Sequence, residues 1–161
     1  MSREWPDLAG QLIRNADGLR HVLPIRVYFE DTDFSGLVYH GSYVRWCERG
    51  RSDFLRLLGN DHRGLIDGHG GREPAAFVVR RMGLEFRRPA RIDEVLEVGT
   101  RVAEMGAAHL VLDQRITRDG VELFTAEVMV VLVSMAGKPL RLAREVRAAF
   151  GAAVTPVAGG Q

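Results

Sequence analysis

Three carboxylates stand within four residues, directly before a stretch with helical periodicity. They are Glu30, Asp31 and Asp33 in the segment EDTDFSGLVYHGSY, which also holds the histidine His40. A carboxylate can attack a carbonyl carbon or take a proton from water. The first N–H groups of a helix lack intrahelical partners and carry partial positive charge. An acid cluster beside a helix start could therefore be the reactive end of an enzyme, whereas a metal site and helix capping or turn formation are the alternatives.

A helix is predicted from about residue 42 to residue 58, because apolar residues recur there every three or four positions. Its apolar face holds Tyr43, Cys47, Gly50, Phe54 and Leu58, and Gly59 is a typical residue after a helix end. The opposite face carries mostly arginines. This helix would place its first N–H groups next to the acidic segment.

Five segments rich in β-branched and aromatic residues predict strands at 25–29, 76–86, 94–105, 109–118 and 121–134. The pair Asp119-Gly120 predicts a tight hairpin between the last two. One strand, one long helix and four further strands predict an α+β domain. We expect an antiparallel sheet of about five strands wrapped around one long central helix.

The domain organisation follows from where these periodic patterns begin and end. We expect a flexible N-terminal arm at 1–20, a single domain at 21–150 and a flexible C-terminal tail at 151–161. A loop rich in Gly, Asp and His is predicted at 60–74, and a short turn or helix at about 142–150.

Composition indicates a soluble cytoplasmic domain. Twenty-two basic and 21 acidic residues give a net charge of +1, so no overall field favours nucleic acid or an anionic membrane. The longest aliphatic run, 128–133, is too short for membrane insertion, and the first residues lack the apolar core of a signal peptide. A single cysteine, Cys47, fits a reducing compartment and a place in the apolar core.

The sequence resembles the hot-dog-fold acyl-CoA thioesterases of the 4-hydroxybenzoyl-CoA thioesterase type, especially the bacterial thioesterases associated with the Tol-Pal system. The similarity runs from about residue 26 to 142 and is carried by RVYFEDTDFSGLVYHGSYVRWCERGRSDFL, FVVRRMGLEFRRPARIDEVLEV and AEVMVVLVSMAGKPLRL. It implies hydrolysis of acyl-CoA to a free acid and CoA. It also implies no metal or organic cofactor, a homodimer or homotetramer, and active sites at the subunit interface.

The resemblance implies catalytic roles for Asp33 and His40. Asp33 would be the nucleophile or the general base, and His40 would orient the substrate or stabilise an anionic intermediate, unless it only bonds a loop carbonyl. The first-turn N–H groups near His40, Gly41 and Ser42 would polarise the thioester oxygen, and Tyr39 would pack at the substrate site and contribute backbone. One departure from the family pattern is Phe29, which stands where the family has a tyrosine and lacks the hydroxyl.

Two further groups of charged residues have competing interpretations. Arg87 and Arg88 could bind the phosphates of CoA or form a solvated sheet edge. Glu48 matches the helix-borne acid that another branch of the fold uses, but Arg45 and Arg51 lie three positions to either side and predict an ion pair.

The histidines and aspartates of the 60–74 loop, Asp61, His62, Asp67 and His69, have no metal-ligand spacing and predict a polar loop. This loop could instead flank the acyl pocket. Two rival functions remain: a hydratase or dehydratase acting on acyl thioesters, and a non-catalytic protein that holds acyl carrier protein or phospholipid-synthesis enzymes.

Overall fold

The structure is a computed structural model that describes residues 4, 8 and 10–151. The predicted tail from residue 152 onward lies outside the described residues, as does most of the predicted arm before residue 10. None of the helices in the described part is long and apolar enough to cross a membrane.

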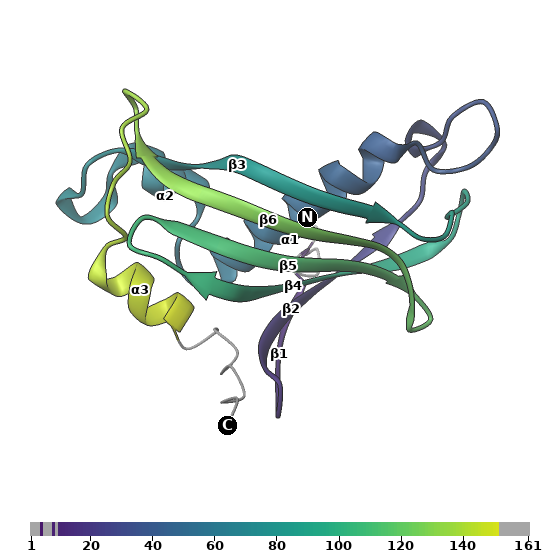
Figure 1. The fold of residues 1–161 in the computed structure, drawn as a ribbon, viewed down its shortest axis with the longest axis horizontal. Helices are drawn as coiled ribbons and strands as arrows, with labels where there is room; N and C mark the ends of the chain where they lie inside the picture. Colours follow the sequence, from purple (N-terminus) through teal and green to yellow (C-terminus); the bar gives the residue numbers. More distant parts are fainter. Residues whose placement is uncertain (1–3, 5–7, 9, 152–161) are drawn as a thin grey trace.

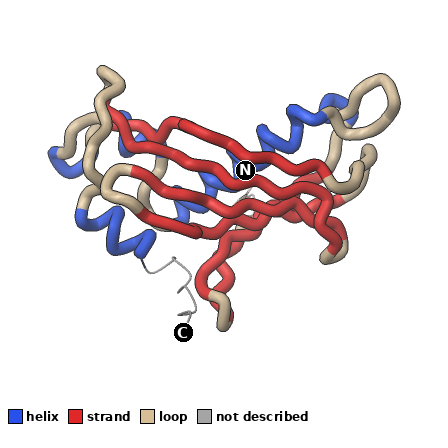
Figure 2. The backbone as a smooth tube through the Cα atoms, viewed as in Figure 1, coloured by secondary structure: helices blue, strands red, loops and turns tan. Residues whose placement is uncertain are grey.

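Six antiparallel strands form one curved sheet (Figures 1 and 2). The strands are β1 (Gln11–Asn15), β2 (Gly18–Arg26), β3 (Ala75–Phe86), β4 (Val95–Met105), β5 (His109–Arg118) and β6 (Val121–Ser134). Their order across the sheet is β1-β2-β4-β5-β6-β3, so β1 and β3 are the two edge strands. The predicted strands at 76–86, 94–105, 109–118 and 121–134 are confirmed to within one residue.

The long helix α1 (His40–Leu57) lies along one face of the sheet, and α2 (His62–Asp67) and α3 (Arg144–Gly151) lie towards its far end (Figure 1). Trp46, Cys47 and Phe54 of α1 are fully buried against the sheet. Gly50 permits this close approach, because a Cβ there would lie 2.9 Å from Val98 Cγ1 of β4. The buried Gln114 fastens α1 to the sheet by donating to the Cys47 carbonyl (2.9 Å).

Two expectations about the N-terminal third were wrong. Residues 11–15 and 18–20 belong to the sheet, as β1 and the start of β2, so the sheet has six strands rather than about five. The strand expected at 25–29 ends at Arg26, and Phe29 begins the 3₁₀ helix η1 (Phe29–Asp31). The reason is that β1 is an exposed edge strand held by backbone pairing to β2, which leaves no alternating apolar pattern in its sequence.

The predicted loop at 60–74 is also more ordered than expected. It contains α2 and the 3₁₀ helix η2 (His69–Gly71). The Asp61 carboxylate caps α2 by accepting from the Gly64 N–H (3.0 Å), and Gly68 ends the helix in the left-handed region at φ 68°. The short terminal helix predicted at 142–150 is confirmed as α3.

Candidate active site

Asp31 holds the loop that precedes α1 in place through hydrogen bonds of its side chain and its carbonyl group. It is buried, and its carboxylate accepts from the Tyr28 N–H (2.8 Å). Its carbonyl oxygen accepts from the Tyr39 N–H (2.8 Å) and the Ser42 hydroxyl (3.1 Å). Asp31 therefore fixes the loop to the helix start.

Asp33 lies in the turn that follows. Its N–H donates to the Leu37 carbonyl (2.9 Å), and its own carbonyl accepts from the Gly36 N–H (3.1 Å). The side chain is exposed to solvent and accepts from the Ser35 hydroxyl and the Ser35 N–H (2.8 Å). The hydroxyl first, and then the N–H, hold the pKa of Asp33 below its usual value. Asp33 is thus an ionised, solvent-facing carboxylate.

The start of α1 offers two N–H groups to a ligand. Tyr39 precedes the helix in an extended conformation, and the N–H groups of His40 and Gly41 have no acceptor among the described residues. Ser42 is buried, and its N–H donates to the Tyr39 carbonyl (2.9 Å). The hydroxyl and the N–H of Ser42 are therefore both used within the loop and the helix start. The N–H groups that are available to a substrate are those of His40 and Gly41.

Glycine at position 41 lets the Tyr39 ring lie against the first turn of α1. A Cβ on Gly41 would lie only 2.8 Å from Tyr39 Cε1. The ring centre of His40 lies 4.3 Å from that of Tyr39 and 6.4 Å, edge-on, from that of Phe86. Phe86 in turn packs on the buried Phe124. The rings of Tyr39 and Phe86 thus pack against the imidazole of His40, and Phe124 supports Phe86 from below the surface.

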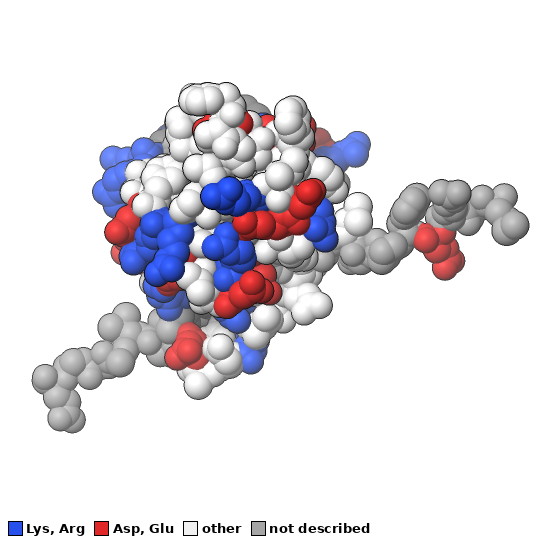
Figure 3. Space-filling model, turned by 90° about the vertical axis from the view of Figure 1, so that its right-hand side faces the viewer, with Lys and Arg blue, Asp and Glu red and all other residues white. Residues whose placement is uncertain are grey.

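The residues after β3 lie beside this loop. The Val38 N–H donates to the Ala90 carbonyl (2.9 Å), and Leu37 forms a β-bridge with Arg91. Basic side chains, interspersed with acidic ones, lie on this end of the molecule (Figure 3). Arg87 is engaged with Glu85 (3.1 Å), whereas the exposed Arg88 has no side-chain acceptor within residues 10–151. Arg88 is therefore the more available guanidinium for an anionic ligand.

The match to known proteins extends over most of the chain. The model of the thioesterase superfamily matches residues 35–125. The chain belongs to the thioesterase superfamily. It is 42% identical over 129 residues to the acyl-CoA thioester hydrolase YbgC of Escherichia coli O6:H1, covering 79% of this chain and 92% of that protein. The acyl-CoA thioesterase YbgC of Haemophilus influenzae is 37% identical over 128 residues, covering 79% of this chain and 91% of that protein.

A solved structure shows the superfamily fold directly. A probable thioesterase from Bartonella henselae is 44% identical, with a TM-score of 0.74 over 77% of this chain and 99% of that one. The hot-dog fold predicted for this superfamily member is confirmed, with six strands in its sheet. Asp33 lies two positions before the residues that the superfamily model matches.

The ion pair predicted for Glu48 was wrong. Glu48 accepts from the Ser52 hydroxyl (2.6 Å), which lies 2.8 Å from His62 Nε2. Arg45 points back towards Asp31 (3.9 Å), and Arg51 donates to Gln114 (3.0 Å). The cause is α2, which the sequence did not predict and which brings His62 to this face of α1.

Cys47 is a fully buried member of the core, as predicted. Burial raises the pKa of its thiol to about 12, so it stays protonated and unreactive at neutral pH. A thiolate nucleophile is thus absent from the part of the chain that the structure describes, whose single cysteine this is.

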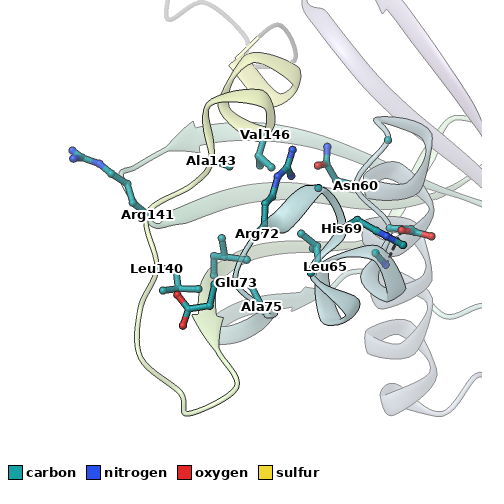
Figure 4. A pocket seen from close by; sticks show the side chains of 16 residues that line it. Asn60, Leu65, His69, Arg72, Glu73, Ala75, Leu140, Arg141, Ala143 and Val146 are labelled. Atoms are coloured by element: carbon teal, nitrogen blue, oxygen red, sulfur yellow. Dashed lines mark hydrogen bonds between the residues drawn. The ribbon is translucent and has the colours of Figure 1, made fainter.

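A cavity of about 480 Å³ lies at the opposite end of α1 (Figure 4). It is bounded by α2, the start of β3 and α3, with Leu65, Ala75 and Val146 among its lining residues. The 18 residues of α1 span about 27 Å between this end and the Asp33 loop. The predicted polar loop therefore does not flank Asp33 within one chain.

The four residues of that loop that could have formed a metal site have other partners or stand apart. Asp61 caps α2, His62 contacts Ser52, and Asp67 lies 3.8 Å from Arg63. No group of three or more His, Cys, Asp or Glu side chains in the described residues is arranged to hold a metal ion.

Ser35 and the pair Ser52–His62 are the site features that sequence reasoning missed. The spacing Asp33-x-Ser35 is a local signal, because an Asp side chain commonly accepts from the backbone two residues on. The contact between Ser52 and His62 had no such signal, since it depends on the orientation of α2.

Proposed function

We propose that the protein hydrolyses an acyl-CoA thioester to a free acid and CoA, with Asp33 as nucleophile or general base. The observation that carries this proposal is an exposed carboxylate of lowered pKa in the loop before α1, a helix whose first two N–H groups have no acceptor among the described residues. The similarity to acyl-CoA hydrolases over 79% of the chain supports the substrate class.

The geometry suggests how the steps would run. The N–H groups of His40 and Gly41 would donate to the thioester oxygen and stabilise the charge that develops on it. If Asp33 attacks the carbonyl carbon, the C–S bond breaks, CoA leaves as a thiolate, and water then hydrolyses the anhydride. If Asp33 instead takes a proton from water, hydroxide attacks and the tetrahedral intermediate collapses to acid and CoA. His40, which packs against Tyr39 and Phe86, would stabilise the anionic intermediate.

The phosphates of CoA would bind at the end of β3. Arg88 is exposed and without a described acceptor, and Arg87 stands beside it in contact with Glu85. Guanidinium groups bind phosphates through paired hydrogen bonds. The neighbouring loop holds Asp33 on the same end of the molecule, which supports this location.

We further propose that two chains pair through β3 as a homodimer. β3 is an edge strand with exposed apolar residues, Leu84 and Phe86 among them, and an unpaired edge of this kind favours pairing with another strand. Antiparallel pairing of two complete β3 strands about a two-fold axis would set Phe86 of one chain opposite Ala75 of the other. Each active site would then lie at a subunit interface.

The association with the Tol-Pal system and a cytoplasmic location are also proposals. They rest on the similarity of residues 26–142 to the Tol-Pal-associated thioesterases and on the single cysteine.

The direct test offers the purified protein a panel of acyl-CoAs and an enoyl-CoA, and measures free CoA and hydration separately. We expect free CoA from at least one acyl-CoA. Hydration of the enoyl-CoA without release of CoA would establish the hydratase alternative. No turnover of any substrate, with acyl carrier protein retained in a binding assay, would instead support the non-catalytic alternative.

A further inference from the structure

The connection between β3 and β4, residues 87–94, is held to the sheet at its start and to α1 at its middle. At its start, the N–H groups of Arg87 and Arg88 both donate to the Leu123 carbonyl of β6 (2.8 and 3.1 Å). At its middle, the N–H of Ala90 donates to the hydroxyl of Tyr43 (3.1 Å), near the beginning of α1. The connection therefore has one anchor on the sheet and a separate one on the helix.

The Tyr43 side chain is fixed before it makes this contact. Its ring is buried, stacked on Phe124 with 5.2 Å between the ring centres. The rings of Trp46 and Phe86 lie edge-on to it, at 5.4 and 5.8 Å. This packing determines where the hydroxyl lies, and the fully buried Ala90 uses that hydroxyl as the acceptor of its N–H.

Two backbone hydrogen bonds continue from Ala90 to the Asp33 loop. The Ala90 carbonyl accepts from the Val38 N–H (2.9 Å), and the carbonyl of the adjacent Leu37 accepts from the Asp33 N–H (2.9 Å). Leu37 also forms a β-bridge with Arg91. A buried hydroxyl on α1 is thus joined, through the connection, to the turn that holds the candidate catalytic carboxylate.

This link matters because the two halves of the candidate site lie on different segments. The N–H groups of His40 and Gly41 belong to α1, whereas Asp33 belongs to the loop before it. A reacting group and the donors that polarise its target must keep a fixed geometry, and a misplacement of about 1 Å can lower a rate by about 100-fold. Tyr43 stands three residues after His40, on the part of the helix that carries the donors.

We propose that Tyr43 is a positioning residue whose hydroxyl, acting through Ala90, holds the Asp33 loop in a fixed geometry relative to the first N–H groups of α1. Tyr43 acts on the reaction only through Asp33. The inference rests on the proposed thioesterase function and adds a residue that this function requires.

Tyr43→Phe is the direct test, because it keeps the ring and its packing and removes only the hydroxyl. The buried Ala90 N–H then loses its acceptor, and the loop loses its fixed place beside α1. We expect kcat to fall by about tenfold. Since Arg87 and Arg88 are held by the Leu123 carbonyl instead, the Kd for free CoA should change by less than about threefold.

Thr100→Val is the matched control for a general loss of stability. Thr100 is buried on β4, and its hydroxyl accepts from Gln114, which also bonds the Cys47 carbonyl at the middle of α1. Each substitution removes one buried hydroxyl acceptor and keeps the rest of the side chain, so both should lower the melting temperature. The fall in kcat should appear in Tyr43→Phe alone. An equal fall in both variants would overturn the proposal.

A double variant shows whether Tyr43 acts through Asp33. In the Asp33→Asn background no carboxylate remains to be positioned, so Tyr43→Phe should lower the residual kcat by less than about threefold. A further tenfold loss in that background would mean that the two residues act independently, which would also overturn the proposal.

Hydrogen exchange tests the positioning role without any turnover. Tyr43→Phe should speed exchange of the Val38 and Asp33 N–H groups by about tenfold, whereas Thr100→Val should leave both near the wild-type rate. This pattern in a protein that hydrolyses no thioester would contradict the proposed function alone. Unchanged exchange of both N–H groups in Tyr43→Phe would contradict the positioning role, whatever the activity.

Discussion

Asp33 and Asp53 are two carboxylates near opposite ends of α1, and they differ in burial and in how far along the chain their hydrogen-bond partners lie. Asp53 accepts from the Gly10 N–H (2.7 Å) and Arg56 (2.8 Å), and lies 2.6 Å from His21 Nε2. Its side chain is only 12% exposed. Those contacts tie the segment before β1, and β2 itself, to the helix.

Asp33 has none of these long-range contacts among the described residues. Its side chain faces solvent, and its hydrogen bonds come from Ser35 in the same turn. A carboxylate whose acceptor positions are taken up by distant parts of the chain stabilises the fold. A carboxylate that is held only by its own turn keeps acceptor positions free for a substrate. Burial and partners, rather than residue type, thus separate the structural acid from the candidate catalytic one.

A substitution at the catalytic end of α1 should cause a large loss of activity. His40→Ala should lower kcat by about 100-fold, because the imidazole that stabilises the anionic intermediate is lost. Since His40 is exposed, the melting temperature should change little. His69→Ala removes another exposed histidine, on η2, and serves as the control. Equal activities of the two variants would show that His40 has no catalytic role.

A substitution at Asp53, near the other end of α1, should lower the stability of the fold rather than the activity. Asp53→Asn should lower the free energy of unfolding by about 2 kcal/mol, because an amide cannot satisfy His21, Arg56 and the Gly10 N–H together. Denaturant titration measures this loss, and kcat of the folded protein should stay close to that of the wild type. A large fall in kcat without a loss of stability would reverse the comparison.

The same cluster predicts a pH dependence of folding. His21 is fully buried, and this desolvation lowers its pKa below 6.5 despite the neighbouring Asp53. The unfolded chain therefore binds the proton first as the pH falls, and stability drops from about pH 6.5 downward until the folded-state pKa is passed. His21→Asn should remove this drop in denaturant titrations at a series of pH values. An unchanged drop in that variant would assign it to other groups.

The smallest effect sharpens the description of Asp33. Ser35→Ala removes the hydroxyl that lowers the pKa of Asp33 most, so the acid limb of the kcat/KM profile should move to higher pH. Activity at neutral pH should change little, because Asp33 remains ionised there. Thr32→Val removes a loop hydroxyl that bonds the Phe29 carbonyl instead, and it should leave the limb in place. Equal shifts in both variants would argue against a specific effect of Ser35.

Long periodic segments made most of the fold predictable. The four strands after α1 and the helix itself follow from alternation and helical spacing over ten or more residues. The turn at Asp119-Gly120 was equally clear, and both residues adopt positive φ as the tight hairpin requires. β1 was missed because backbone pairing with β2 holds it, so its side chains show no alternating pattern.

The candidate site was only partly predictable, because contacts that are local in sequence leave a pattern there and contacts set by tertiary packing do not. Asp33 and His40 could be picked out because they lie close together in sequence, in a recognisable motif. Ser42 was expected to bind substrate, yet its hydroxyl donates to the Asp31 carbonyl and its N–H to the Tyr39 carbonyl. The partners of Glu48 and Asp53 depend on where α2 and β2 pack, and local spacing does not encode that.

The most direct test of the central claim is the rate of CoA release by Asp33→Asn, measured against the wild type with a preferred acyl-CoA. The amide keeps the shape of the side chain but can neither attack the carbonyl nor take a proton. We expect kcat to fall by about 10²–10⁴-fold while the melting temperature stays unchanged, because Asp33 is exposed. Undiminished release of CoA by Asp33→Asn would contradict the assignment of Asp33 as the catalytic carboxylate.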